Sequence, residues 1–221
     1  MANKNSQQAV RIPADSVILE GVLDVPQGAQ AIVIFAHGSG SSRHSPRNKF
    51  VAKVLREAGM GTLLFDLLTR EEDTIYENRF DISLLTVRLK AVTLWLKSQP
   101  QTMNLRIGYF GASTGAAAAL NSAADLGIII GAIVSRGGRP DMAEQALRKV
   151  QAPTLLVVGE YDDIVIKLNQ LAYNLIKAEK ELTIIPGATH LFEEPGTLEK
   201  VARLAAKWFK QHLLSHPFPN P

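Results

Sequence analysis

Short runs of apolar residues alternate along the chain with longer segments in which apolar residues recur every three or four positions. Glycine or polar residues bound the short runs, as is typical of buried strands. The first two runs, at 10–15 and 16–26, lie close together and predict an opening hairpin. Six further runs predict the strands of a buried sheet, at 31–38, 61–68, 105–113, 126–138, 153–163 and 181–190.

The intervening segments carry the signals of helices. Ser45 is placed to cap a helix that has Pro46 at its first position and ends before Gly59. Two longer amphipathic helices are predicted from the spacing of Ile82, Leu85, Leu89, Val92 and Leu96 and from that of Leu198, Val201, Leu204 and Trp208. This alternation predicts an α/β protein with a mostly parallel sheet of about eight strands, flanked by helices, in a single domain over residues 1–221.

Composition places the chain among globular proteins. Apolar residues make up 46% and charged residues 20% of the chain, and the net charge of +3 is dispersed, which does not predict a nucleic-acid surface. The absence of cysteine excludes disulfides and thiol chemistry. The start of the chain is polar, and the longest apolar run, LGIIIGAIV, is too short to span a bilayer. We therefore expect a soluble, cytoplasmic protein with no nucleic-acid or membrane partner.

Polar residues with catalytic potential follow four of the predicted strands. They are HGSGSSRHS at 37–45, GASTG at 111–115, GEYDD at 159–163 and GATH at 187–190. In parallel α/β sheets the functional groups gather beyond the carboxyl ends of the strands. Ser113 comes directly after a predicted strand and before an alanine-rich, helix-forming segment, which is the context of a nucleophile elbow.

The glycines around Ser113 fit such an elbow for a steric reason. A serine at this turn takes a strained backbone conformation, and side chains at positions 111 and 115 would collide with their surroundings. Gly111 and Gly115 also suit close packing of a helix on a sheet, with Ser113 as an ordinary turn residue. An acid and then a histidine at later strand ends, in the order Ser, Asp, His, favour catalysis over this alternative.

These motifs together resemble the α/β-hydrolase superfamily and, within it, the dienelactone-hydrolase-like group. HG with a small residue after the third strand, G-x-S-x-G after the fifth, G-x-x-D-x-x-V after the seventh and a histidine after the eighth occur in the family order. The resemblance covers nearly the whole chain. Dienelactone hydrolases proper are known for a cysteine at the elbow, whereas this chain has Ser113, which favours serine-esterase chemistry.

A serine hydroxyl is a poor nucleophile at neutral pH, so a neutral imidazole must accept its proton. His190, on the loop after the last predicted strand, is the predicted base, and a structural histidine bonded to the backbone is the alternative. The resemblance assigns the acid of the triad to Asp162. The adjacent Asp163 is better suited to the start of the following helix, where a carboxylate complements the helix dipole.

The tetrahedral intermediate of acyl transfer needs donors that already point at its oxygen. We expect the backbone N–H of Thr114 and the N–H of Ser39 to supply them, with Gly38 allowing the loop to come close. The alternative for HGSGSS is a plain loop between a strand and a helix. No catalytic role is predicted for the remaining histidines, which are His37, His44, His212 and His216.

Arginines near the same rim raise the question of what the substrate carries. Arg43 and Arg136 are the predicted ligands of a substrate carboxylate, and pairing of these arginines with local acids such as Asp141 is the alternative. Residues 136–152 leave room for one short helix and no cap domain between the sixth and seventh strands. An open site of this kind favours small, soluble esters or lactones.

The sequence thus predicts a serine hydrolase that cleaves small esters or lactones through an acyl-enzyme, with no cofactor and no metal. A thioesterase or acyltransferase would use the same residues on a different leaving group. A binding protein that keeps the fold without activity is the third interpretation, because a fold does not imply a function.

Overall fold

The structure is a computed structural model that describes residues 7–214. Its strands are β1 (Gln7–Ala14), β2 (Val17–Asp24), β3 (Ala31–Ala36), β4 (Gly61–Phe65), β5 (Arg106–Ala112), β6 (Ile130–Arg136), β7 (Thr154–Gly159) and β8 (Lys180–Ile185). Its α-helices are α1 (Pro46–Glu57), α2 (Arg70–Asp73), α3 (Ile82–Ser98), α4 (Thr114–Leu126), α5 (Glu144–Leu147), α6 (Asp163–Leu175) and α7 (Thr197–Phe209). Shorter helical turns are η1 (Tyr76–Phe80), η2 (Gly127–Ile129), η3 (Pro140–Ala143) and the π-helical η4 (Lys210–Leu214).

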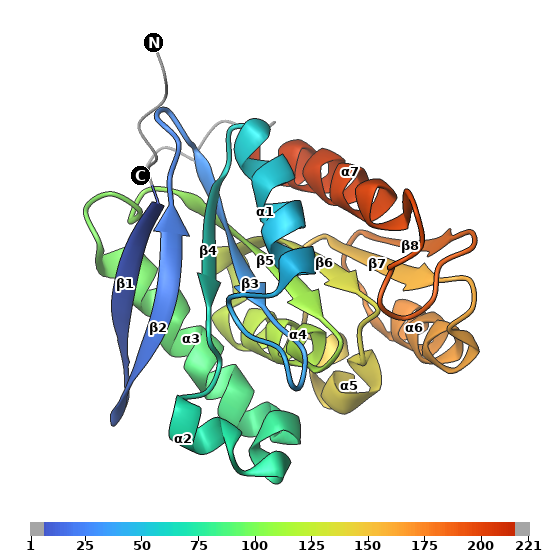
Figure 1. The fold of residues 1–221 in the computed structure, drawn as a ribbon. Coiled ribbons are helices and arrows are strands. Elements are labelled where there is room, and N and C mark those ends of the chain that lie inside the picture. Colours follow the sequence, from blue (N-terminus) through green and yellow to red (C-terminus); the bar gives the residue numbers. More distant parts are fainter. Residues whose placement is uncertain (1–6, 215–221) are drawn as a thin grey trace.

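The strands form one sheet in the order β1-β2-β4-β3-β5-β6-β7-β8 (Figure 1). β1 and β2 make the expected hairpin, and β2 pairs antiparallel with β4. The six strands from β3 to β8 are parallel to one another. The prediction of a mostly parallel eight-stranded sheet is therefore confirmed, and all six parallel strands end at one edge of the sheet.

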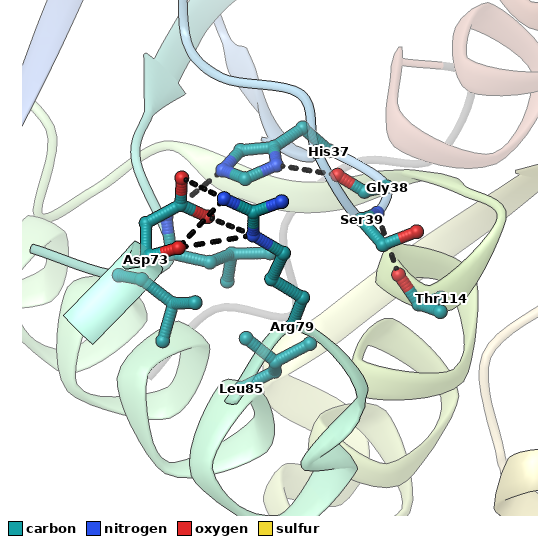
Figure 2. A pocket seen from close by; sticks show the side chains of 10 residues that line it. His37, Gly38, Ser39, Asp73, Arg79, Leu85 and Thr114 are labelled. Atoms are coloured by element: carbon teal, nitrogen blue, oxygen red, sulfur yellow. Dashed lines mark hydrogen bonds and ion pairs between the residues drawn. The ribbon is translucent and has the colours of Figure 1, made fainter. Parts of the chain in front are cut away.

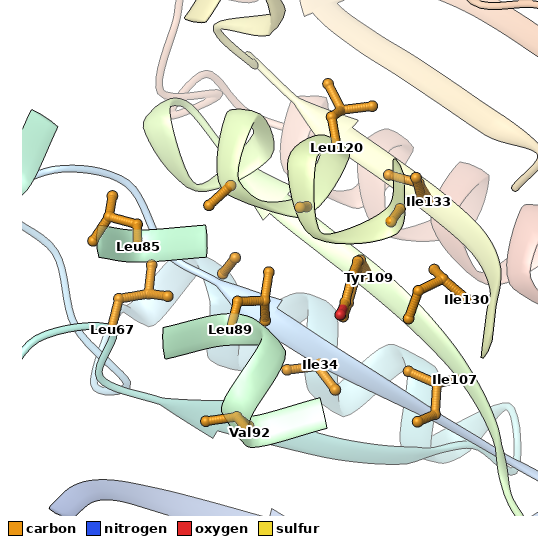
Figure 3. Packing of buried hydrophobic residues seen from close by; sticks show 14 of the residues in the cluster. Ile34, Leu67, Leu85, Leu89, Val92, Ile107, Tyr109, Leu120, Ile130 and Ile133 are labelled. Atoms are coloured by element: carbon orange, nitrogen blue, oxygen red, sulfur yellow. The ribbon is translucent and has the colours of Figure 1, made fainter. Parts of the chain in front are cut away.

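Two hydrophobic clusters fill the space between the sheet and its helices. On one face, α3, α4 and the end of α6 cover the sheet, and Figure 3 shows Leu89 and Leu120 of the first two helices around Tyr109 of β5. The phenol of Tyr109 is fully buried and hydrogen-bonded to the Thr93 hydroxyl at 2.6 Å. On the other face α1 and α7 pack, with Val51 and Val201 among their buried residues.

Local signals explain where several helices begin. Ser45 caps α1 by accepting a hydrogen bond from the N–H of Asn48, and Pro46 stands at the first position, as predicted. The helix α4 starts with residues of very small volume, and Ala116, Ala117, Ala118 and Ala119 are all fully buried. Small side chains let this helix lie close to β5 and α3, which fixes the serine turn that precedes it.

Two connections contain more structure than the sequence pattern indicated. Between β4 and α3 the chain forms α2 and η1, which the hydrophobic pattern does not predict because neither has a buried residue. Between β6 and β7 it forms η3 and α5 in place of the one short helix expected. Within residues 7–214 there is no extra domain, and none of the helices there has the length and apolarity to cross a bilayer.

Candidate active site

Ser113 connects β5 to α4 in a backbone conformation that serine rarely adopts. Its φ is 50° and its ψ is −120°, and it is one of three non-glycine residues with positive φ in residues 7–214. Such a conformation persists only where the surroundings hold it. Here the N–H of Ser113 donates to the carbonyl of Arg136 at 3.2 Å, and its own carbonyl accepts from the N–H of Arg139 at 3.1 Å.

The glycines of the motif are required by close backbone approaches. A Cβ at Gly111 would lie 2.5 Å from the Cα of Ala116, and one at Gly115 would lie 2.2 Å from the carbonyl oxygen of Ala36. Real Cβ atoms do not come so close to backbone atoms. A Cβ at Gly38 would lie 3.0 Å from the Cβ of Ser113, so the loop after β3 runs directly against the serine.

Asp162 and His190 meet at the end of β7. The loop after β8 is held there because the N–H of Tyr161 donates to the carbonyl of Ala188 at 2.9 Å. Nδ1 of His190 and Oδ2 of Asp162 are 2.5 Å apart. The side chain of Asp162 is 15% exposed and that of His190 is 38% exposed, so the imidazole is the more accessible partner. Asp163 is the first residue of α6, as expected.

A short segment after β6 connects this pair to the serine turn. Arg136 and Arg139 hold the backbone of Ser113, and Gly137 lies between them with a φ of 52°. A Cβ at Gly137 would lie 3.4 Å from both Cε1 and Nδ1 of His190, so the ring rests on this glycine. No hydrogen bond joins Ser113 to His190 in the part of the chain that the structure describes. Such bonds are often long without substrate.

The loop after β3 contacts the first residue of α4 through a side chain. The backbone N–H of Ser39 donates to Oγ1 of Thr114 at 2.9 Å (Figure 2). Both residues line a small pocket whose other wall comes from α2, η1 and α3. The structure therefore brings Ser39 and Thr114 together next to Ser113, and the partner of the Ser39 N–H is the Thr114 hydroxyl.

His37 is buried and both of its ring nitrogens are occupied. Nε2 lies 3.1 Å from the backbone N of Leu67, which donates to it, so Nδ1 must carry the proton that Gly38 accepts at 2.9 Å (Figure 2). Burial lowers the pKa of His37 from its ordinary value of 6.5, while the backbone bond to Gly38 and the charges of Asp66 and Asp73 oppose this shift. A neutral His37 thus ties the end of β3 to the end of β4.

Of the remaining histidines, His44 and His212 lie within the described residues and His216 lies outside them. His44 is exposed on the loop after β3. His212 packs against Trp208 with ring centroids 4.3 Å apart, and its Nε2 lies 3.6 Å from Glu179. His216 lies outside residues 7–214.

The β4–α3 connection contains an ion pair that the sequence motifs do not predict. Arg79 of η1 donates from Nε and Nη2 to both the carboxylate and the carbonyl of Asp73, at distances of 2.7–3.0 Å. Figure 2 shows this pair facing His37 across the small pocket. One feature of the sequence could have indicated a helix in this segment. Thr69 and Glu72 have the spacing of a capping box, and they form one at the start of α2.

The arginines of the rim differ in their partners. Arg43 is paired with Asp66 and with Glu20, and Arg139 is paired with Asp141 at 2.7 Å. The pairing of Arg139 with Asp141 is the local one expected as the alternative, whereas Arg43 pairs with acids that are distant in the sequence. The guanidinium of Arg136 has no hydrogen bond or ion pair within residues 7–214, although the residue is only 7% exposed.

The surroundings of Arg136 are unusual for a buried cation. Its guanidinium carbon lies 5.7 Å from the ring centroid of Phe192, and its Nε is buried without a partner. Burial, together with the nearby positive charge of Arg47, lowers the pKa of Arg136 to about 10. The group is still charged at neutral pH, and Arg47 has its own partner in Glu193 at 2.8 Å.

The strand order, with a serine turn after β5, defines an α/β-hydrolase. The sequence model of the dienelactone hydrolase family matches residues 19–213. The chain therefore belongs to the dienelactone hydrolase family, as its sequence motifs indicated.

Solved structures agree with this assignment. The crystal structure of a dienelactone hydrolase from Anabaena variabilis is similar to this chain with 54% identity and a TM-score of 0.92, covering 95% of this chain and 99% of that one. Est1E from Butyrivibrio proteoclasticus has 19% identity and a TM-score of 0.80, with 92% and 98% of the two chains covered. An esterase from Pyrococcus furiosus has the same identity and TM-score, with 95% and 92% covered. The last two share the fold.

Two Mycobacterium tuberculosis proteins, from strains CDC 1551 and H37Rv, are 58% identical to this chain over 206 residues. Both are named, provisionally, as phosphoribosyl transferases. The match covers 93% of this chain and 46% of each relative. The chain thus spans about half the length of these relatives, and it shares with them most of the region that matches the dienelactone hydrolase family.

We expect the substitution His37→Gln to reduce the loss of stability in acid. Since the pKa of His37 is lowered in the folded state, the unfolded chain binds a proton first, and stability is lost as the pH falls below about 6.5. Glutamine can donate and accept hydrogen bonds but does not titrate. The decrease in Tm between about pH 7.5 and about pH 5 should be smaller in the variant than in the parent. The same change at exposed His44 is the control, and equal decreases for His37→Gln and the parent would contradict this account.

Proposed function

We propose that the protein is a serine hydrolase that cleaves small carboxylic esters or lactones, with Ser113 as nucleophile, His190 as general base and Asp162 as the acid that orients it. The observation that carries this proposal is the strained backbone of Ser113 next to the hydrogen-bonded Asp162–His190 pair. The side chain of Ser113 does not cap α4, so helix capping does not account for the strain. Strain of this kind is concentrated at functional sites.

The proposed reaction follows from what each group can accept and donate. The hydroxyl oxygen of Ser113 attacks the ester carbonyl carbon while Nε2 of His190 takes the hydroxyl proton. The carboxylate of Asp162 accepts a hydrogen bond from Nδ1–H of His190 and stabilises the imidazolium that forms. His190 then gives its proton to the departing alcohol oxygen, which leaves an acyl group on Ser113. A water molecule repeats the sequence on the acyl-enzyme, releases the acid and restores Ser113.

The negative oxygen of the tetrahedral intermediate requires donors that are fixed in advance. We assign the backbone N–H of Thr114 as one of them, because it stands at the first position of α4, where N–H groups are free and the helix dipole is positive. The N–H of Ser39 was predicted as the other donor. Gly38 supports a place for this loop in the site, since a larger residue there would meet Ser113.

The proposed substrates are small because the described chain contributes no extra domain over the serine. A thioesterase or acyltransferase would use the same groups on a different leaving group, and a comparison of oxygen esters with acyl-CoA substrates separates them. We do not propose the transferase activity named for the Mycobacterium tuberculosis proteins, because less than half of their length matches this chain.

We also propose that the substrate carries a carboxylate that Arg136 binds. The support is that the guanidinium of Arg136 is buried, charged and unpaired. The same residue also holds Ser113, because its carbonyl accepts the hydrogen bond from the Ser113 N–H. A buried charge without a partner destabilises a protein, so its presence is explained if an anion arrives with the substrate. Arg43 was the second predicted ligand, but its guanidinium already contacts Asp66 and Glu20.

We expect a fluorophosphonate probe to modify Ser113. Peptide mapping after labelling should find the adduct on this residue, and Ser113→Ala should abolish labelling and lower ester turnover by several orders of magnitude. The control Ser41→Ala removes a hydroxyl from the neighbouring loop and should leave labelling intact. Turnover by Ser113→Ala at the parent rate would show that another residue is the nucleophile.

We expect substitutions of the adjacent carboxylates Asp162 and Asp163 to have different effects. Asp162→Asn should lower kcat by roughly 10⁴-fold with the fold intact, because an amide favours the wrong imidazole tautomer. Asp163→Asn should leave kcat nearly unchanged and alter the free energy of unfolding by about 1 kcal/mol or less, because its carboxylate only complements the helix dipole. Steady-state kinetics and Tm of both variants test this. The opposite pattern would make Asp163 the acid.

We expect Arg136→Met to change selectivity without loss of stability. The variant should lower kcat/KM for an acid-bearing ester by about tenfold or more relative to its neutral analogue, because a hydrogen bond to a charged group contributes about 1.5–3 kcal/mol. Its Tm should stay level or rise, since methionine removes an unpaired buried charge. Arg139→Met, which loses a surface ion pair, is the control. Equal losses on both esters would reject carboxylate binding.

A further inference from the structure

The hydroxyl of Thr114 has one hydrogen bond in which it accepts and none in which it donates. Its oxygen accepts the N–H of Ser39 at 2.9 Å. A hydroxyl carries one proton as well as its acceptor lone pairs, and no residue in 7–214 is recorded as accepting the proton of Thr114. Thr114 is 2% exposed as a residue, and it lines the small pocket beside Ser39. An unused donor that is nearly buried needs an explanation.

The position of Thr114 suggests where the acceptor comes from. The residue follows Ser113 directly and begins α4, so it has no carbonyl of a preceding helical turn to which its hydroxyl could donate. Figure 2 shows the hydroxyl oriented toward the loop of Gly38 and Ser39, the same loop that approaches the Cβ of Ser113. The hydroxyl and the backbone N–H of one threonine lie close together by covalent geometry. The hydroxyl therefore lies close to the N–H that is assigned to the proposed oxyanion.

We propose that the Thr114 hydroxyl donates a hydrogen bond to the oxyanion, and that the N–H of Ser39 acts through it. This inference rests on the proposed function. As Ser113 attacks, the carbonyl π electrons move to the substrate oxygen, which accepts from the N–H and the O–H of Thr114, and the hydroxyl proton stays on Thr114. The bond from Ser39 fixes the hydroxyl oxygen and directs its proton away from the loop. A hydroxyl that accepts one hydrogen bond also donates a stronger one.

This assignment changes the role expected for Ser39. The sequence motif predicted its N–H as a direct oxyanion donor, yet that N–H is engaged with the Thr114 oxygen. Two other roles for the Thr114 hydroxyl make different predictions. If it only fastened the loop, its removal would lower stability and leave the chemical step unchanged. If it competed with the oxyanion for the Ser39 N–H, its removal would raise kcat.

The test compares Thr114→Val, which keeps the shape and loses the hydroxyl, with Thr114→Ser, which keeps the hydroxyl. We expect Thr114→Val to lower kcat for a short ester by about 10²-fold to 10³-fold, as removal of an oxyanion donor does, with KM within a few fold of the parent. Thr114→Ser should restore kcat to within a few fold. Ser122→Ala, which removes another buried hydroxyl from α4, should change Tm but leave kcat unchanged. Thr114→Ala replaces the valine variant if that variant does not fold.

Each result has a definite meaning for the two proposals. A Thr114→Val enzyme with the parent kcat, or a higher one, overturns the role of the hydroxyl, as does a Thr114→Ser enzyme as slow as the valine variant. If Ser113→Ala is inactive in the same assays, the proposed function survives that outcome. A parent protein without Ser113-dependent ester turnover overturns both.

Discussion

The positive φ of Ser113 is the constraint on which the rest of the site depends. A non-glycine residue in a sparsely populated backbone region is unfavourable by on the order of 1–3 kcal/mol, so neighbouring segments must hold it. The last residue of β6 and the segment that follows it form hydrogen bonds with the N–H and the carbonyl of Ser113. The end of β3 approaches Gly115 too closely for any side chain. Because β5 lies between β3 and β6 in the sheet, the strand order itself brings these supports to one residue.

His37 and His190 show that the surroundings of an imidazole decide whether it is structural or available for proton transfer. Both ring nitrogens of His37 form hydrogen bonds with the backbone, and burial lowers its pKa. This ring connects two strand ends and cannot exchange a proton without breaking a hydrogen bond. His190 has one nitrogen engaged by Asp162, and no partner for Nε2 is recorded in residues 7–214. Accessibility and a free nitrogen, rather than residue type, make His190 suitable for proton transfer.

The sequence predicted the sheet well because β3 to β7 are buried and read as continuous apolar runs. It located the serine turn because glycine is obligatory there. It also placed Asp162 and His190 at the right strand ends, and their catalytic roles stay a prediction. It could not predict α2 and η1, which bury no apolar face, nor the pairing of Arg43 with Asp66 and Glu20. Those partners are more than twenty positions apart and meet only once the sheet has formed.

Asp162 occupies the N-cap position of α6 but does not cap it. Aspartate is among the best capping residues, and a missing cap weakens a helix by about 1 kcal/mol. The carboxylate instead faces His190, so the first turn of α6 depends on other contacts, such as the packing of the buried Val165. Improving helix caps is a route to higher thermal stability, but it is not open at the start of α6. If the Asp162 side chain turned to cap the helix, it would lose its hydrogen bond with His190.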